Sequence, residues 1–140
     1  HMSYQRIDAD DSDNLITYEF RWTDGNMAGA RRIFDEGDDE PTVENVSMKY
    51  EDNPVNMNVD LNALWPITAY QMFANDYGLG FYGKRNADFI SSEYFVGSDG
   101  YESETFFKYK KDMRGRVSTA SAEWENDGKE YGLIAKIKYK

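Results

Sequence analysis

The sequence contains no cysteine, and its single histidine is His1. Without cysteine, the chain can form neither a disulfide framework nor a thiolate nucleophile. His1-Met2 resembles a cloning remnant, and the remaining residues then hold no histidine for a catalytic triad or for a typical zinc or haem site. The sequence therefore predicts no metal centre and no cofactor.

Basic residues are also scarce, because 16 lysines and arginines stand against 26 aspartates and glutamates, which gives a net charge of −10. A protein that binds nucleic acid needs a basic surface to neutralise phosphates, and binding to an anionic membrane surface needs the same. No apolar run approaches the roughly 18–20 residues that span a bilayer. We therefore expect neither a nucleic-acid partner nor a transmembrane segment.

Aromatic residues are abundant, at 16% of the chain, and this enrichment favours β-strands. A triplet of a large apolar, a basic and an aromatic residue occurs four times, as Phe20-Arg21-Trp22, Met48-Lys49-Tyr50, Phe107-Lys108-Tyr109 and Ile137-Lys138-Tyr139. In an extended chain alternate side chains point to opposite faces, so each triplet places two apolar groups on one face and a cation on the other. The four triplets predict strands of one antiparallel sheet with a core face and a solvent face.

The chain divides into a leader, residues 1–14, and a single β-rich domain, residues 15–140. The leader carries four aspartates, Asp8, Asp10, Asp11 and Asp13. An EF-hand calcium loop needs glycine where Asp13 stands, so we interpret this segment as a loose, solvated leader. Alternation then predicts strands over 15–22, 27–34 and about 46–50, with Asp24-Gly25 as the first hairpin turn.

Alternation returns near the end of the chain, where it predicts strands over 101–110, 116–125 and 131–139. Asn126-Asp127-Gly128 is a strong signal for the hairpin that joins the last two. The final strand has the clearest pattern, with Tyr131, Leu133, Ala135, Ile137 and Tyr139 on one face and lysines on the other. We therefore expect it to be paired within the sheet.

The middle segment, about residues 56–90, interrupts this alternation. Pro66 suits the first position of a helix and Gly78 suits its end, so the spacing predicts a short helix and an irregular connection packed on the sheet. Aromatic residues gather here, namely Trp65, Tyr70, Tyr77, Phe81 and Tyr82. These five residues are the candidate ligand-binding site, because exposed rings can stack on sugar rings or on an apolar patch of a partner protein. The alternative is that they cover the apolar face of the sheet.

Two carboxylates form a second candidate site. Glu102 and Glu104 lie about 7 Å apart on one face of a strand, a separation at which two acids can hydrolyse a glycosidic bond. Lys108 and Lys110 continue the same face. A charged, solvent-facing row is the simpler interpretation, and no catalytic residue is assigned.

Residues 20–27 and 107–117 have the same pattern. Each is a predicted strand, then a turn that contains Asp and Gly, then an apolar residue that begins the next strand. They flank the segment Leu79-Gly80-Phe81-Tyr82-Gly83-Lys84-Arg85-Asn86. This arrangement resembles YD-repeat (Rhs-like) proteins and is more closely similar to a group of uncharacterised YD-repeat-like lipoproteins of Bacteroides-type gut bacteria, over about residues 15–140. The resemblance implies an extracytoplasmic module, on the cell surface or in the periplasm and lipid-anchored in its precursor. It supplies no catalytic residues.

We therefore expect a mainly β fold, with a single antiparallel meander of hairpins and one short helix with an irregular segment packed on it. The expected function is a non-catalytic binding or interaction module whose ligand is a glycan or a protein. Two alternatives stay open. One is a structural, repeat-like spacer in a larger cell-surface assembly, and the other is a carboxylate-dependent glycoside hydrolase.

Overall fold

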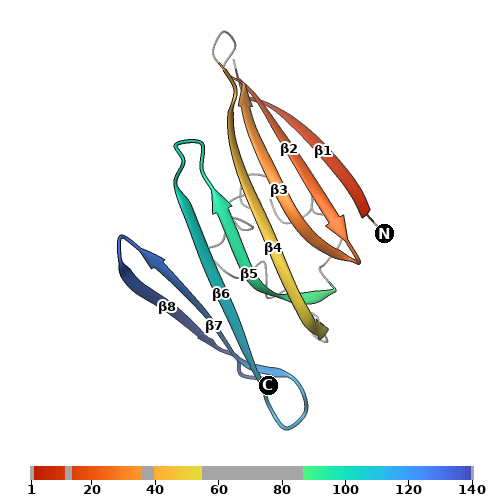
Figure 1. Cartoon of the computed structure of the whole chain (residues 1–140). Helices are drawn as coiled ribbons and strands as arrows, with labels where there is room; N and C mark the ends of the chain where they lie inside the picture. The colour runs from red at the N-terminus through yellow and green to blue at the C-terminus, as the bar shows by residue number, and fades with distance from the viewer. Residues whose placement is uncertain (1, 12–13, 36–39, 55–86, 140) are drawn as a thin grey trace.

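A computed structural model describes residues 2–11, 14–35, 40–54 and 87–139 of the chain. The strands are β1 (Met2–Asp11), β2 (Asn14–Thr23), β3 (Asn26–Asp35), β4 (Thr42–Pro54), β5 (Asp88–Val96), β6 (Glu102–Lys111), β7 (Val117–Asn126) and β8 (Lys129–Lys136). They form one eight-stranded antiparallel sheet in which each strand pairs with the next in the chain. Figure 1 shows this meander, with β1 and β8 at opposite edges of a strongly twisted sheet. The prediction of a mainly β meander is confirmed.

The triplets occupy equivalent places in the sheet. Three of them lie in β2, β4 and β6, and the fourth directly follows β8. Their cations, Arg21, Lys49, Lys108 and Lys138, are all exposed. Phe20, Met48 and Phe107 are no more than 5% exposed. Each triplet therefore separates a core face from a solvent face, as the alternation predicts.

The hydrophobic core is built mainly on one face of β2–β7. Register places Phe20 opposite Ala30, Ala30 opposite Val46, and Val46 opposite Phe95, so one row of side chains crosses four strands on the same face. The buried apolar residues are Tyr18, Phe20, Trp22, Met27, Ala30, Val46, Met48, Phe89, Ile90, Phe107, Val117, Ala120 and Ala122. Burial of these side chains is the main force that stabilises the sheet.

A partly buried ion pair lies in the same face. Arg32 on β3 is directly opposite Glu44 on β4, and its Nε donates to the Glu44 carboxylate at 2.7 Å. The guanidinium also lies over the Phe34 ring, 4.6 Å from its centroid. The two side chains are only 12% and 17% exposed, so the ion pair is largely shielded from water.

Three tyrosines make one repeated contact between non-adjacent parts of the chain. The hydroxyls of Tyr50 and Tyr109 donate to the main-chain carbonyls of Met27 and Ile90, each at 3.0 Å. Tyr139 donates in the same way to Val117 at 2.7 Å. The three accepting residues stand near the starts of β3, β5 and β7 and are 0–1% exposed. The hairpins β3–β4, β5–β6 and β7–β8 therefore share one stabilising contact.

Both predicted tight turns are present. Asp24 and Asp127 have φ of 51°, and the glycines that follow them, Gly25 and Gly128, have φ of 84° and 73°. Positive φ at both central residues is the geometry of a type I′ hairpin, which aspartate tolerates and glycine adopts freely. The first of these turns also contacts β5, because the Asn26 side chain donates to Asp88 at 2.8 Å and accepts from its main-chain N–H at 2.9 Å.

Two expectations differ from the structure, and a third falls outside the residues it describes. Residues 2–11 are not a loose leader, because they form β1 and pair with β2 along their whole length. Strand β5 lies between the predicted strands, where no strand is expected, and its consecutive buried residues Phe89 and Ile90 do not follow simple alternation. The short helix predicted from Pro66 lies outside the described residues.

Candidate functional site

The predicted ligand-binding residues Trp65, Tyr70, Tyr77, Phe81 and Tyr82 lie outside the described residues. The second predicted pair, Glu102 and Glu104, is described, and both side chains are exposed on the solvent face of β6. Tyr94 on β5 lies beside them, and its hydrogen bond to Glu102 raises its pKa, with smaller contributions from burial and from the two carboxylate charges. The pair belongs to a charged row on an open surface.

The described residues do contain an aromatic surface, on the core face at the C-terminal side of the sheet. Its members are Phe95, Tyr101, Trp124, Tyr131 and Leu133. Trp124 and Tyr131 stack with ring centroids 5.8 Å apart and an interplanar angle of 14°. Phe95 and Tyr101 form a second pair at 6.5 Å. Tyr101 is 46% exposed, Tyr131 44% and Leu133 36%, so this part of the core face is open to solvent.

Strand register explains why these rings meet. The turn at Asp127-Gly128 pairs Asn126 with Lys129, and two residues further along each strand the ladder places Trp124 opposite Tyr131. Trp124 is also opposite Thr105 on β6, which is in turn opposite Glu93 on β5. Thr105 and Glu93 are 7% and 3% exposed. The row therefore runs from a buried polar end to an open aromatic end.

Two shallow depressions lie over β3 and β7 on the opposite, solvent face. One, of about 230 Å³, lies over β3 between Arg21 and Ser47, where Gly29 has no side chain to fill it. The other, of about 410 Å³, lies over Thr119 and Ser121 of β7, between lysines of β6 and Ile134 of β8. Both form because a glycine or short side chains stand between longer neighbours. Their linings are mixed and partly charged, which distinguishes them from the aromatic surface.

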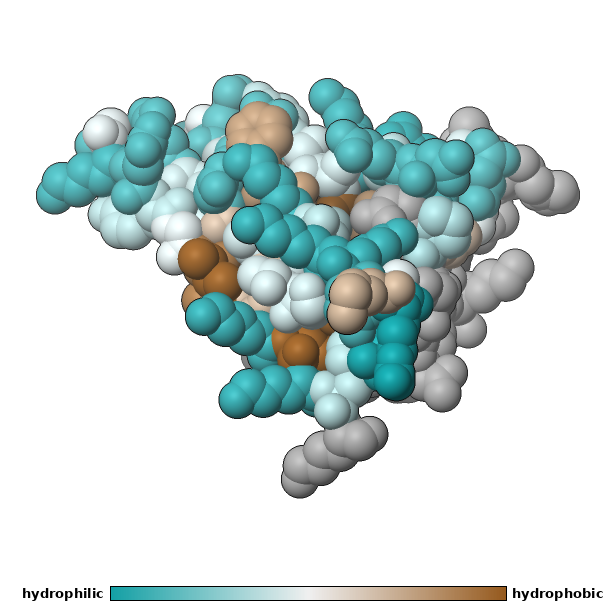
Figure 2. Space-filling view, turned by 90° about the horizontal axis from the view of Figure 1, so that it is seen from below, coloured by the Kyte–Doolittle hydropathy of each residue, from teal (hydrophilic) through white to brown (hydrophobic). Residues whose placement is uncertain are grey.

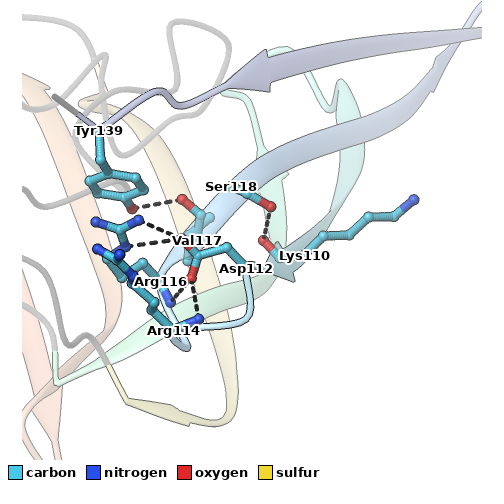
Figure 3. Close-up of polar contacts among 7 residues, drawn as sticks. All are labelled: Lys110, Asp112, Arg114, Arg116, Val117, Ser118 and Tyr139. Atoms are coloured by element: carbon cyan, nitrogen blue, oxygen red, sulfur yellow. Dashed lines mark hydrogen bonds and ion pairs between the residues drawn. The ribbon is translucent and has the colours of Figure 1, made fainter.

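The turn between β6 and β7 is held by a compact polar cluster (Figure 3). Asp112 accepts from the main-chain N–H groups of Arg114 and Arg116, at 2.9 and 3.0 Å, and from the Arg116 guanidinium at 2.7 and 2.9 Å. These bonds, the side-chain one first, lower the pKa of Asp112. The guanidinium lies 4.0 Å from the centroid of the Tyr139 ring. The cluster ties the residues after β8 to this turn and is structural.

Figure 2 views the molecule from the lower end of Figure 1, where the turn between β6 and β7 lies, and shows mostly hydrophilic side chains with small separate hydrophobic spots. Among the described residues, no group of three or more His, Cys, Asp or Glu side chains is arranged to hold a metal ion. Nor does the described part of the chain include a helix with the length and hydrophobicity that a membrane crossing requires. The aromatic surface is therefore the best candidate site that the structure describes.

Sequence reasoning missed this site, although one signal could have found it. The hairpin signal at Asn126-Asp127-Gly128 fixes the pairing of Trp124 with Tyr131 once a two-residue turn is assumed. What the sequence does not contain is the exposure of these rings, because that depends on how far the rest of the chain covers the sheet. No protein-family model, curated protein or solved structure matches the chain.

Proposed function

We propose that this domain is a non-catalytic binding module and that the aromatic surface on β5–β8 contacts its ligand. The observation that carries the proposal is the Trp124–Tyr131 stack, whose tyrosine is 44% exposed on the face that elsewhere forms the core. Large apolar side chains left open on a core-forming face are typical of interaction sites.

The chemistry of the surface supports a flat ligand with apolar faces. Trp124 and Tyr131 are nearly parallel and present rigid rings that lose little conformational entropy on binding. Such rings suit the apolar face of a sugar ring or an aromatic-rich patch of a partner protein. The net charge of −10 disfavours phosphate-rich partners. A glycan or a protein is therefore the proposed class of ligand.

We also propose an extracytoplasmic location, on the cell surface or in the periplasm, which rests on the resemblance to YD-repeat-like lipoproteins. The lack of cysteine and the single histidine support a role without nucleophilic or metal-dependent catalysis. A carboxylate-dependent hydrolase would need Glu102 and Glu104. Substituting both with glutamine and assaying glycosidase activity tests that alternative.

The proposed function is tested by a thermal-shift screen of the chain against oligosaccharides and glycoproteins, followed by titration of each hit. Trp124→Ala is expected to weaken binding by about 30-fold, the effect of losing a central aromatic anchor. The matched control is Phe106→Ala, because Phe106 is an exposed ring, at 48%, on the opposite face of the sheet. Retained binding by the Trp124 variant, or equal loss in both variants, would contradict the proposed surface.

A further inference from the structure

The edge strand β8 is open along its length. Within the described residues, β8 pairs with β7 alone, and every residue from Lys129 to Lys136 is exposed. An exposed edge offers a row of main-chain donors and acceptors to another strand. Natural edges are blocked by proline, bulges or repulsive charges. β8 contains no proline, and its register with β7 is continuous.

The direction of the main-chain groups on β8 follows from one contact beyond its end. Ile137 donates its N–H to the Ser118 carbonyl at 3.0 Å, so odd-numbered residues of this strand face β7. In an antiparallel ladder the N–H and C=O of alternate residues point to opposite sides. Those of Glu130, Gly132, Ile134 and Lys136 therefore point away from β7. They are available to a further strand.

We propose that this edge pairs with the same edge of a second copy of the chain, antiparallel and about a two-fold axis through Leu133. This register puts Glu130 opposite Lys136 of the second copy and Lys136 opposite its Glu130. Gly132 then faces Ile134 of the second copy, and Leu133 faces its own counterpart. All the even-numbered pairs are hydrogen-bonded pairs, as the outward direction of their main-chain groups requires.

The side chains of β8 are self-complementary in this register. Ile134 is 66% exposed, more than Tyr131 or Leu133 on the same strand. In the proposed register it would pack over Gly132 of the second copy, which has no side chain. Both charged pairs join opposite signs on the solvent face. Moving the axis to Gly132 places Glu130 opposite Ile134, and moving it to Ile134 places Lys136 opposite Gly132. The shift to Gly132 loses both charged pairs, and the shift to Ile134 replaces them with pairs between Glu130 and Lys138, which lies beyond the end of β8. The axis at Leu133 is favoured because it keeps both charged pairs within the strand.

This association would also extend the aromatic surface. Tyr131 and Leu133 lie on the face opposite to Ile134, so pairing about Leu133 brings the two aromatic surfaces together on one side of a continuous sheet. The self-association does not depend on the identity of any ligand, and its tests need none.

The first test uses charge reversal and sedimentation equilibrium of the full chain. Glu130→Lys and Lys136→Glu each replace two attractive pairs by two repulsive ones, so each variant alone is expected to raise the dimer dissociation constant about tenfold or more. An equimolar mixture of the two variants restores opposite charges at every pair and should associate again. A monomeric wild-type chain at all concentrations, or a mixture no better than the single variants, would overturn the proposal.

The second test uses the absence of native cysteine. Leu133→Cys places two thiols at the two-fold axis in a non-hydrogen-bonded pair, where Cα atoms lie about 4.5 Å apart and a disulfide can close. In Tyr131→Cys, on the same strand and face, the two thiols lie about 14 Å apart by strand rise. Under the same mild oxidation, the first variant should form covalent dimers and the second should not. Equal cross-linking of both would exclude this register.

Discussion

Replacing Tyr109 with phenylalanine removes one hydroxyl and leaves the ring and its packing in place. That hydroxyl donates at 3.0 Å to the carbonyl of Ile90, a residue that is 1% exposed. A neutral hydrogen bond contributes about 0.5–1.5 kcal/mol net, and a buried carbonyl left without its donor costs about 1–3 kcal/mol. We expect Tyr109→Phe to lower the free energy of unfolding by about 1–2 kcal/mol.

The same argument applies to Tyr50→Phe and Tyr139→Phe, whose hydroxyls donate to Met27 and Val117 at 3.0 and 2.7 Å. Tyr50 is directly opposite Ile90 in the ladder of β4 and β5, so the contacts of Tyr50 and Tyr109 are neighbours and their effects should add only approximately. The triple variant would then lose roughly 3–5 kcal/mol, which is a large part of the stability of a typical domain.

Urea unfolding followed by far-UV circular dichroism measures these differences, and thermal midpoints should fall by about 2–4 °C for each kcal/mol lost. Tyr131→Phe is the matched control. Tyr131 is 44% exposed, so removing its hydroxyl leaves no buried group without a hydrogen-bond partner. The reasoning is refuted if the variants of Tyr50, Tyr109 and Tyr139 are no less stable than this control, since the repeated contact would then not contribute to folding.

Three further substitutions test other contacts by urea unfolding. Gly29→Ala would place a Cβ 2.8 Å from a main-chain carbonyl oxygen of β4 and should lower the free energy of unfolding by about 1–3 kcal/mol. In the control Gly132→Ala, the nearest atom is 3.6 Å from the new Cβ, so its free energy of unfolding should stay within about 0.5 kcal/mol of wild type. Glu44→Gln should cost about 1–3 kcal/mol, because Glu44 is 17% exposed, and Glu123→Gln should change little at 56% exposure. The pKa of Asp112 is lowered from 3.8, so the stability advantage of wild type over Asp112→Asn should be present above pH 3.8 and fade as the pH falls through the folded-state pKa. A pH-independent difference would contradict that sign.

The sequence predicted the strands whose alternation is strict. In β2, the core residues Tyr18, Phe20 and Trp22 alternate with Glu19 and Arg21, and period-two burial follows directly from the pleat. Strand β5 was missed for the opposite physical reason. Its residues are buried in consecutive pairs, because the ladder with β4 shifts register there. Where the pairing is irregular, buried and exposed residues no longer alternate, so the sequence does not show the period-two pattern of a strand.

The pairing of β1 could not be predicted from its composition. An acidic, polar segment satisfies the rule for a solvated leader, but its backbone can still complete a ladder with β2. The candidate site shows a similar division. The pairing of Trp124 with Tyr131 follows from the turn between them, whereas their exposure is a property of the whole molecule. The density of aromatics instead directed attention to residues 65–82, all of which lie outside the described residues.

The three tyrosine contacts allow the hairpins to be compared position by position. In each hairpin, the residue seven positions after the buried acceptor lies opposite the residue eight positions before the tyrosine. These pairs are Phe34 with Thr42, Gly97 with Tyr101, and Trp124 with Tyr131. The stabilising contact is thus the same in these three hairpins, while the residues at their far ends differ. Of these three positions, the last alone pairs two rings directly across the strands. Since none of the three tyrosine contacts involves Trp124 or Tyr131, substitutions of these two residues should alter binding far more than they alter folding.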